Sequence, residues 1–242
     1  MKTMIIVHDA RIPGEYLDSL KSRIGRAEWI SLDMTGFSAV YGSVMNHPDI
    51  YFFKLGPATF IHAPNVPKNI LEKLQSFGIE LIEGISVPEG KYPGTARYNA
   101  VRVGGDLIHN LDITETVILD RAGREGLRSV NVAQGYCRCA VLGLNGNTAV
   151  TSDHGIEKAM AKAGKEIFYL EPSDILLPGE KHGFLGGTSG TLSDGTVIMI
   201  GDPASSEKTA PLYDICARKE IDLICAKGLP LVDAGSLIVC EI

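Results

Sequence analysis

The sequence predicts an α/β fold in which five similar units close into one ring with pseudo-fivefold symmetry. Each unit has the same order: an apolar strand, a turn containing Gly or Asn, a second strand, a polar residue, an amphipathic helix and a short third strand. Four complete copies follow one another, and the parts of a fifth lie at opposite ends of the chain. Because the fifth unit forms only if the two ends meet, the repeats predict a closed ring rather than an open stack.

The first complete copy shows the signals of a ββαβ unit most clearly. Its elements are predicted at 49–55, 59–63, 67–77 and 79–82. Gly56-Pro57 joins the two apolar runs as a turn, and apolar residues recur at helical spacing in the third element. Gly78 stands where a helix C-cap is expected, so the helix ends there and a third strand follows.

The other copies repeat this order with turns of their own. The second unit has its elements at 99–103, 106–109, 113–122 and 127–132, the third at 137–144, 148–151, 155–163 and 167–170, and the fourth at 183–188, 197–200, 207–218 and 221–224. The fifth takes its first strand from 231–240 and the rest from 4–8, 14–24 and 29–32. Gly104-Gly105, Asn145-Gly146-Asn147 and Ser193-Asp194-Gly195 are typical hairpin turns.

The composition fits one compact domain. The 242 residues are 45% hydrophobic and 21% charged, and no linker or charge block interrupts them. We therefore expect a single domain over residues 1–242, with units at approximately 41–88, 95–132, 135–176, 182–226, and 229–242 plus 1–34.

Net charge and cysteine content limit the partners and the cellular compartment that we expect. A net charge of −6 gives no support to binding of a nucleic-acid backbone, and no apolar stretch is long enough to span a membrane. The apolar run at the start of the chain is too short for a signal peptide. Five cysteines without regular spacing indicate reduced thiols and a cytoplasmic protein. The expected partner is a small-molecule substrate or ligand, with no nucleic acid and no membrane, and the oligomeric state is left open.

A fivefold ββαβ propeller resembles the pentein superfamily. That superfamily includes arginine and agmatine deiminases, glycine amidinotransferases and dimethylarginine hydrolases, and also translation initiation factor 6, which is not an enzyme. Residues 47–52 (HPDIYF) and the hairpin strand at 59–64 resemble the His-x-Asp strand and hairpin of the catalytic members. Residues 134–139 (QGYCRC) and 182–190 (HGFLGGTSG) resemble segments of an uncharacterised bacterial branch of the superfamily.

The resemblance implies a cysteine-dependent hydrolase or transferase acting on a small guanidino or amidino compound. Carboxylates would hold the planar cation through its N–H groups. A cysteine thiolate would attack the central carbon and give a covalent thiouronium-type intermediate. A histidine would move the protons. The chemistry therefore needs a cysteine, a histidine and carboxylates around one pocket.

His47 and Asp49 are the candidates for the proton carrier and the cation-binding carboxylate. Residues two apart in a strand share a face, so both side chains are expected to point into the ring. The alternative is that the His-Pro-Asp sequence merely starts a strand, with Pro48 at its permitted first position.

The preferred nucleophile is Cys139, with Cys137 second. The two are expected to share the inner face of one strand, whereas Cys240 lies at the far end of the last strand and fits poorly. Their position departs from the consecutive order of the resembled family, because the unit with Tyr98 and Asn99 lies between His47 and Cys139. Buried cysteines that serve only packing are the alternative.

Other polar residues on first strands are candidates for substrate binding. These are Tyr98, Asn99, Cys137, His182 and Asp233. No metal is expected, because the cysteine pair lacks the Cys-x-x-Cys and His spacing of a zinc site, and no cofactor is expected.

Three functions follow from these residues. The first is a cysteine-dependent amidinohydrolase or amidinotransferase. The second is a non-catalytic pentein that binds a small polar ligand in the central pocket. The third is an interaction module similar to translation initiation factor 6, against which the acidic charge argues.

Overall fold

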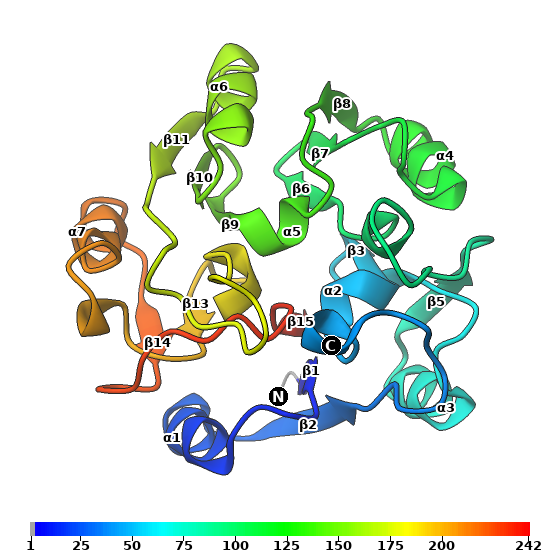
Figure 1. The fold of residues 1–242 in the computed structure, drawn as a ribbon, viewed down its shortest axis with the longest axis horizontal. Coiled ribbons are helices and arrows are strands. Elements are labelled where there is room, and N and C mark those ends of the chain that lie inside the picture. Colours follow the sequence, from blue (N-terminus) through cyan, green and yellow to red (C-terminus); the bar gives the residue numbers. More distant parts are fainter. Residues whose placement is uncertain (1–2) are drawn as a thin grey trace.

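The computed structural model describes residues 3–242 and contains five three-stranded sheets arranged around a common centre (Figure 1). In each sheet the middle strand pairs antiparallel with one neighbour and parallel with the other. The sheets are β3 (Phe52–Gly56), β4 (Thr59–His62) and β5 (Glu80–Glu83); β6 (Val101–Val103), β7 (Asp106–His109) and β8 (Arg128–Asn131); β9 (Val141–Asn145), β10 (Thr148–Thr151) and β11 (Glu166–Tyr169); β12 (Ser189–Thr191), β13 (Val197–Met199) and β14 (Leu223–Cys225); β15 (Ile238–Glu241), β1 (Met4–Asp9) and β2 (Ala27–Leu32).

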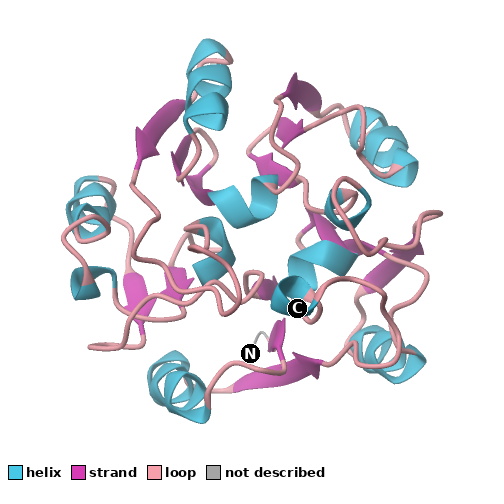
Figure 2. Ribbon diagram, viewed as in Figure 1, coloured by secondary structure: helices cyan, strands magenta, loops and turns pink. Residues whose placement is uncertain are grey.

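One longer helix accompanies each sheet and lies on the outside of the ring (Figure 2). These helices are α1 (Gly14–Ile24), α3 (Lys68–Ser76), α4 (Thr116–Arg124), α6 (His154–Lys162) and α7 (Pro211–Arg218). Each helix packs its apolar side against its sheet and leaves its charged side in water; in α3 the buried residue is Leu74. No helix among residues 3–242 has the length and hydrophobicity needed to cross a bilayer.

The chain ends meet in one sheet, as the split fifth unit predicts. β15 pairs antiparallel with β1, with Ile5 opposite Cys240 and Val7 opposite Ile238. Thr3 and Ile242 exchange two further backbone hydrogen bonds of 2.7 and 3.0 Å. The predicted α/β fold of five ββαβ units, closed through the two ends of the chain, is therefore confirmed.

The first strand of each unit begins later than the sequence predicts. The expected starts at 49, 99, 137, 183 and 231 are replaced by Phe52, Val101, Val141, Ser189 and Ile238. The preceding residues form short helical turns or irregular loops at the ring centre, among them α2 (Pro48–Tyr51), α5 (Cys137–Ala140) and the 3₁₀ turn η3 (Gly186–Thr188).

The early helical turns follow from the lack of a strand partner. Phe52 pairs with His62, and beyond His62 the second strand leaves the sheet toward α3. The residues before Phe52 therefore pair their backbone groups outside a regular ladder: the amide of Ile50 donates to the carbonyl of His47 within the turn, and the amide of Asp49 donates to the carbonyl of Gly235. Pro48 occupies the first helical position, where its missing N–H has no cost. The prediction that His47 and Asp49 share a strand face is wrong.

Candidate functional site

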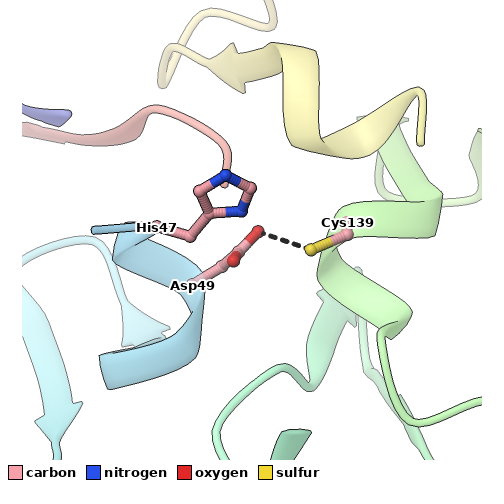
Figure 3. A group of neighbouring side chains, drawn as sticks. All are labelled: His47, Asp49 and Cys139. Atoms are coloured by element: carbon pink, nitrogen blue, oxygen red, sulfur yellow. Dashed lines mark hydrogen bonds between the residues drawn. The ribbon is translucent and has the colours of Figure 1, made fainter. Parts of the chain in front are cut away.

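His47, Asp49 and Cys139 converge at the centre of the ring, although 90 residues separate Asp49 from Cys139 (Figure 3). His47 and Asp49 come from the start of α2, and Cys139 comes from α5. One donor atom from each of the three lies within 4.8 Å of the other two. All three side chains are buried. The structure thus brings together the three residues that the sequence analysis selected for catalysis.

Cys139 forms a hydrogen bond with the carboxylate of Asp49. Its thiol donates to Asp49 Oδ2 at 3.1 Å. In a helical turn, residues two apart point in different directions, so Cys137 does not share this position. The Cys137 thiol instead donates to the backbone carbonyl of Gln134. The prediction of one strand face for both cysteines is wrong because 137–140 is helical, and only Cys139 faces the site.

Asn99 holds the α2 and α5 segments together. Its side-chain nitrogen donates to the Asp49 backbone carbonyl at 3.1 Å and approaches Cys139 Sγ at 3.2 Å. Its side-chain oxygen accepts from the Cys139 amide at 3.1 Å. Asn99 is fully buried, and its contacts fix the thiol beside the carboxylate. It lies in the loop before β6 rather than on the strand predicted at 99–103.

Ser236 is a site residue that the sequence analysis missed. Its hydroxyl donates to Asp49 Oδ2 at 2.8 Å, so that oxygen accepts from both Ser236 and Cys139. Ser236 has a positive φ of 63°, and the neighbouring Gly235 has a φ of 68°. Its sequence signal is a Gly-Ser pair shortly after Asp233, within a run that the sequence predicts to be one continuous strand.

His47 lies between two buried carboxylates. Its Nε2 is 3.9 Å from Asp9 Oδ2, and its Nδ1 is 3.9 Å from Asp233 Oδ1. Asp233 lies in the loop before β15, not in the strand predicted at 231–240, and its oxygens accept from the amides of Phe184 and Gly235. Asp9 also pairs with Arg11 at 2.6 Å.

The Gly-rich run of the fourth unit encloses Asp233. A Cβ on Gly187 would lie 1.9 Å from Asp233 Oδ1, and a Cβ on Gly183 would lie 2.4 Å from Asp233 Cβ. Such distances exclude any side chain at these positions. The backbone of this run therefore approaches a carboxylate of the protein itself. The prediction of a strand at 183–188 is wrong, because these residues form a loop and η3.

Burial sets the protonation states of the site. Burial raises the pKa of Asp49 and raises the pKa of Cys139 well above its usual range. Burial and the nearby charge of Asp49 raise the pKa of Asp233 to about 7. Burial, with the nearby Arg11 guanidinium, lowers the pKa of His47 to about 3. At neutral pH the site thus contains a neutral thiol and a neutral imidazole.

Two buried polar atoms of the site have no hydrogen-bond partner among residues 3–242. They are Nδ1 of His47 and Oδ1 of Asp49. Buried polar atoms in folded proteins are nearly always paired, because desolvation without a partner costs about 1–3 kcal/mol each. These two atoms therefore mark the place where a ligand with N–H groups could bind.

A cavity of about 390 Å³ reaches His47 and Cys139, whereas Asp49 is not among its described lining residues. His47, Cys139 and Asp233 line it, together with aromatic side chains. Its walls also include Tyr41, Tyr92, Tyr136, His182 and Phe184. His182 thus lies on the cavity wall, whereas Tyr98 does not line the cavity. The Tyr98 hydroxyl donates to the Ser86 carbonyl at 2.7 Å and supports the loop after β5.

The same three central residues could hold a metal ion. Cysteine sulfur, imidazole nitrogen and carboxylate oxygen form a donor set suited to zinc. The thiol would have to lose its proton first, against a raised pKa. Sequence spacing did not reveal this group, because its donors come from two separate segments.

Comparisons place the chain among known folds. No curated protein matches its sequence. DDAH from Pseudomonas aeruginosa, solved as a cysteine-to-serine mutant complexed with citrulline, superposes with a TM-score of 0.53 at 11% identity, covering 92% of this chain and 91% of that chain. Agmatine deiminase from C. jejuni, a cysteine-to-serine form with substrate bound, gives 0.53 at 12% identity, with 92% and 86% covered.

A third solved structure extends the likeness to a transferase. SxtG, an amidinotransferase from Microseira wollei in the saxitoxin biosynthetic pathway, gives a TM-score of 0.52 at 12% identity, covering 93% of this chain and 88% of that chain. At these identities the likeness establishes a shared fold, the pentein fold. The sequence matches a family model over residues 7–238, and the chain therefore belongs to DUF6873, a family of unknown function, with the architecture of the penteins.

Proposed function

We propose that this protein is a cysteine-dependent hydrolase or transferase that acts on a small guanidino or amidino compound. The observation that carries the proposal is the buried group of Cys139, Asp49 and His47, in which Asp49 Oδ1 and His47 Nδ1 have no partner among the described residues. The fold shared with DDAH, an agmatine deiminase and an amidinotransferase is consistent with it.

Binding of a cation would change the protonation states that burial sets. A guanidinium donates hydrogen bonds to carboxylates, and Asp49 Oδ1 is a buried acceptor without a partner among the described residues, near enough to Asp233 to influence its pKa. Burial raises the pKa of Cys139 first, and the charges of Asp49 and Asp233 add to it; the positive charge of a bound guanidinium would counter those two carboxylates. The thiol would then ionise only when the substrate is present, which protects it from other electrophiles.

The covalent step uses Cys139 and His47. The neutral imidazole takes the thiol proton while sulfur bonds to the central carbon of the guanidinium. The C–N bond to the leaving amine then breaks, and the imidazolium returns the proton to that amine. The carboxyl groups of Asp9 and Asp233, each 3.9 Å from a His47 nitrogen, would offset part of the cost of burying the resulting imidazolium.

Release of the product reverses the proton movement. His47 takes a proton from water as its oxygen attacks the same carbon, and the C–S bond breaks to regenerate the thiol. Attack by water gives a ureido product, and attack by a second amine gives amidino transfer. The roles of Asn99 and Ser236 are to position Cys139 and Asp49 rather than to react.

The test is to offer the protein a panel of guanidino and amidino compounds and to measure turnover as the release of ammonia or amine. Cys139→Ala and His47→Ala should each reduce turnover by at least about 100-fold. Cys137→Ala is the matched control, because its thiol is buried two residues away and faces Gln134. Full turnover by Cys139→Ala would refute the proposal.

A second candidate is a non-catalytic protein that binds a small cation in the same cavity. The raised pKa of Cys139 and its burial favour this alternative. Saturable binding of a guanidinium compound without a covalent adduct, unchanged in Cys139→Ala, would distinguish it from the enzyme.

A further inference from the structure

A second and larger cavity lies inside the ring, on the other side of Asp49. Its volume is about 510 Å³, and it shares no described lining residue with the cavity at Cys139. The inner strands β3, β6, β9, β12 and β15 all contribute to its wall, and β3, β6, β9 and β15 are seen gathered near the centre of Figure 1. Asp49 and Arg138 lie at its inner end, and exposed hairpin turns at Pro57, Asn145 and Ser193 form its rim.

Equivalent positions of the five units face this cavity. When the five sheets are compared by their strand pairing, one residue of each first strand occupies the same position and lines the cavity. These residues are Lys54, Arg102, Gly143, Thr191 and Val239. Two of the five are cations. Lys54 donates to the carbonyl of Val239 in the neighbouring unit, so the ammonium group reaches across the inner wall.

The positive charge in this cavity is poorly balanced. Among residues 3–242, neither Lys54 nor Arg138 has a carboxylate within ion-pair distance. Arg138 directs its Nη atoms to three backbone carbonyls, those of Val141, Gly186 and Ser189. Arg102 is paired with Glu125 at 3.0 Å near the surface.

The acidic groups near these cations are few. Asp49 is the only acidic side chain among the described lining residues, and it is engaged by Cys139 and Ser236. Glu241 lies on β15 near Lys54 and accepts from the Ser193 amide at the rim. Burial lowers the pKa of Lys54 more than the nearby Cys240 and Glu241 raise it, and the Arg138 charge lowers it further. Burial likewise lowers the pKa of Arg138, against the opposing influence of Asp49 and Asp233.

We propose that this axial cavity is a binding site for a small oxyanion, a carboxylate or a phosphate ester, held by Lys54 with Arg138 at the inner end. Burying a cation without a counterion is costly, and a bound oxyanion would relieve that cost through charge-assisted hydrogen bonds. The volume lies within the range of small-molecule sites. The chain has a net charge of −6, so the site would be a local feature rather than a property of a basic surface.

The experiment is isothermal titration calorimetry of the full chain with inorganic phosphate and with citrate, at constant ionic strength in sodium chloride. Saturable binding of either anion is expected. Lys54→Met should weaken it by at least about tenfold, as expected for loss of one charge-assisted hydrogen bond. Lys158→Met, at an exposed position of α6, should leave it unchanged. No saturable binding to the wild type, or equal affinity in Lys54→Met, would overturn the proposal.

A second pair of variants keeps the test decisive if Lys54→Met does not fold. Gly143 lies on the wall, and a Cβ there would meet only Val103 Cγ2 at 3.7 Å, an ordinary contact. Gly143→Glu adds a carboxylate next to the cavity, and Gly143→Gln adds a neutral side chain of nearly the same shape. Glu should abolish anion binding while Gln largely retains it. Equal behaviour of the two variants would contradict a role for the positive charge.

Discussion

Asp233→Asn offers a direct test of the electrostatics of the site, and it needs no knowledge of the substrate. Asp233 is buried, accepts hydrogen bonds from the amides of Phe184 and Gly235, and lies near the charge of Asp49. Burial and that charge raise its pKa from 3.8 to about 7. The folded protein therefore binds this proton more tightly than the unfolded chain does.

The sign of the pH effect follows from that difference. Between pH 4 and pH 7 the folded state retains a proton that the unfolded state has lost, so the free energy of unfolding falls as the pH rises. A shift of roughly 3 pKa units corresponds to about 4 kcal/mol lost across this window. Asparagine cannot titrate, so the variant lacks this contribution. It also carries a pH-independent loss of about 1–3 kcal/mol, because its NH₂ group faces a backbone N–H donor.

The assay is urea denaturation of wild type and Asp233→Asn at several pH values from 4 to 8. The difference in free energy of unfolding, wild type minus variant, should fall by about 4 kcal/mol from the acidic to the alkaline end. Asp214→Asn, at an exposed position of α7, should give a flat difference. A flat difference for Asp233→Asn, or one that rises with pH, would refute the reasoning.

Two further predictions concern the framework of the site. Gly235→Ala should destabilise the fold by about 2–4 kcal/mol in urea and displace His47, because φ is +68° and the new Cβ would lie 2.1 Å from His47 Cβ. Gly195→Ala also has a positive φ but open surroundings, so it should cost only about 1 kcal/mol; equal losses would contradict the steric argument. Deletion of residues 237–242 removes β15 and should abolish cooperative unfolding by circular dichroism, whereas a sharp melt at an unchanged temperature would contradict ring closure.

The ring could be predicted from sequence because its signals are local and repeated. Each hairpin has its own turn residues, and each helix has its own apolar spacing, so the same order could be recognised in every unit. Closure followed from the incomplete unit at the two ends, and the pairing of β15 with β1 bears this out.

The inner ends of the strands could not be predicted in the same way. Residues 49–55 and 137–144 are apolar runs in which a short helical turn and a strand look alike. The distinction depends on whether a neighbouring strand continues alongside, which only the tertiary structure decides. For this reason the sequence predicts a shared face for Cys137 and Cys139, whereas the structure points them in different directions.

The contacts that position the site also depend on the tertiary structure. Ser236 is 187 residues from Asp49, yet the two form a hydrogen bond at 2.8 Å. Asn99 was selected as a polar residue at the start of a strand, but its bonds to the Cys139 amide and the Asp49 carbonyl arise only when three units meet. Sequence could identify the polar residues, but not which of them would hold the others in place.

The most direct test of the central claim is covalent labelling with chloroacetamidine, a guanidine-shaped electrophile, with chloroacetamide as the uncharged control. Intact mass and peptide mapping identify the labelled cysteine among the five. We expect rapid and selective labelling of Cys139 by the amidine, slow labelling by the amide, and loss of that preference in Asp49→Asn. Equal reactivity with both reagents, or preferential labelling of Cys137 or Cys240, would contradict a cation-binding pocket beside an activatable Cys139.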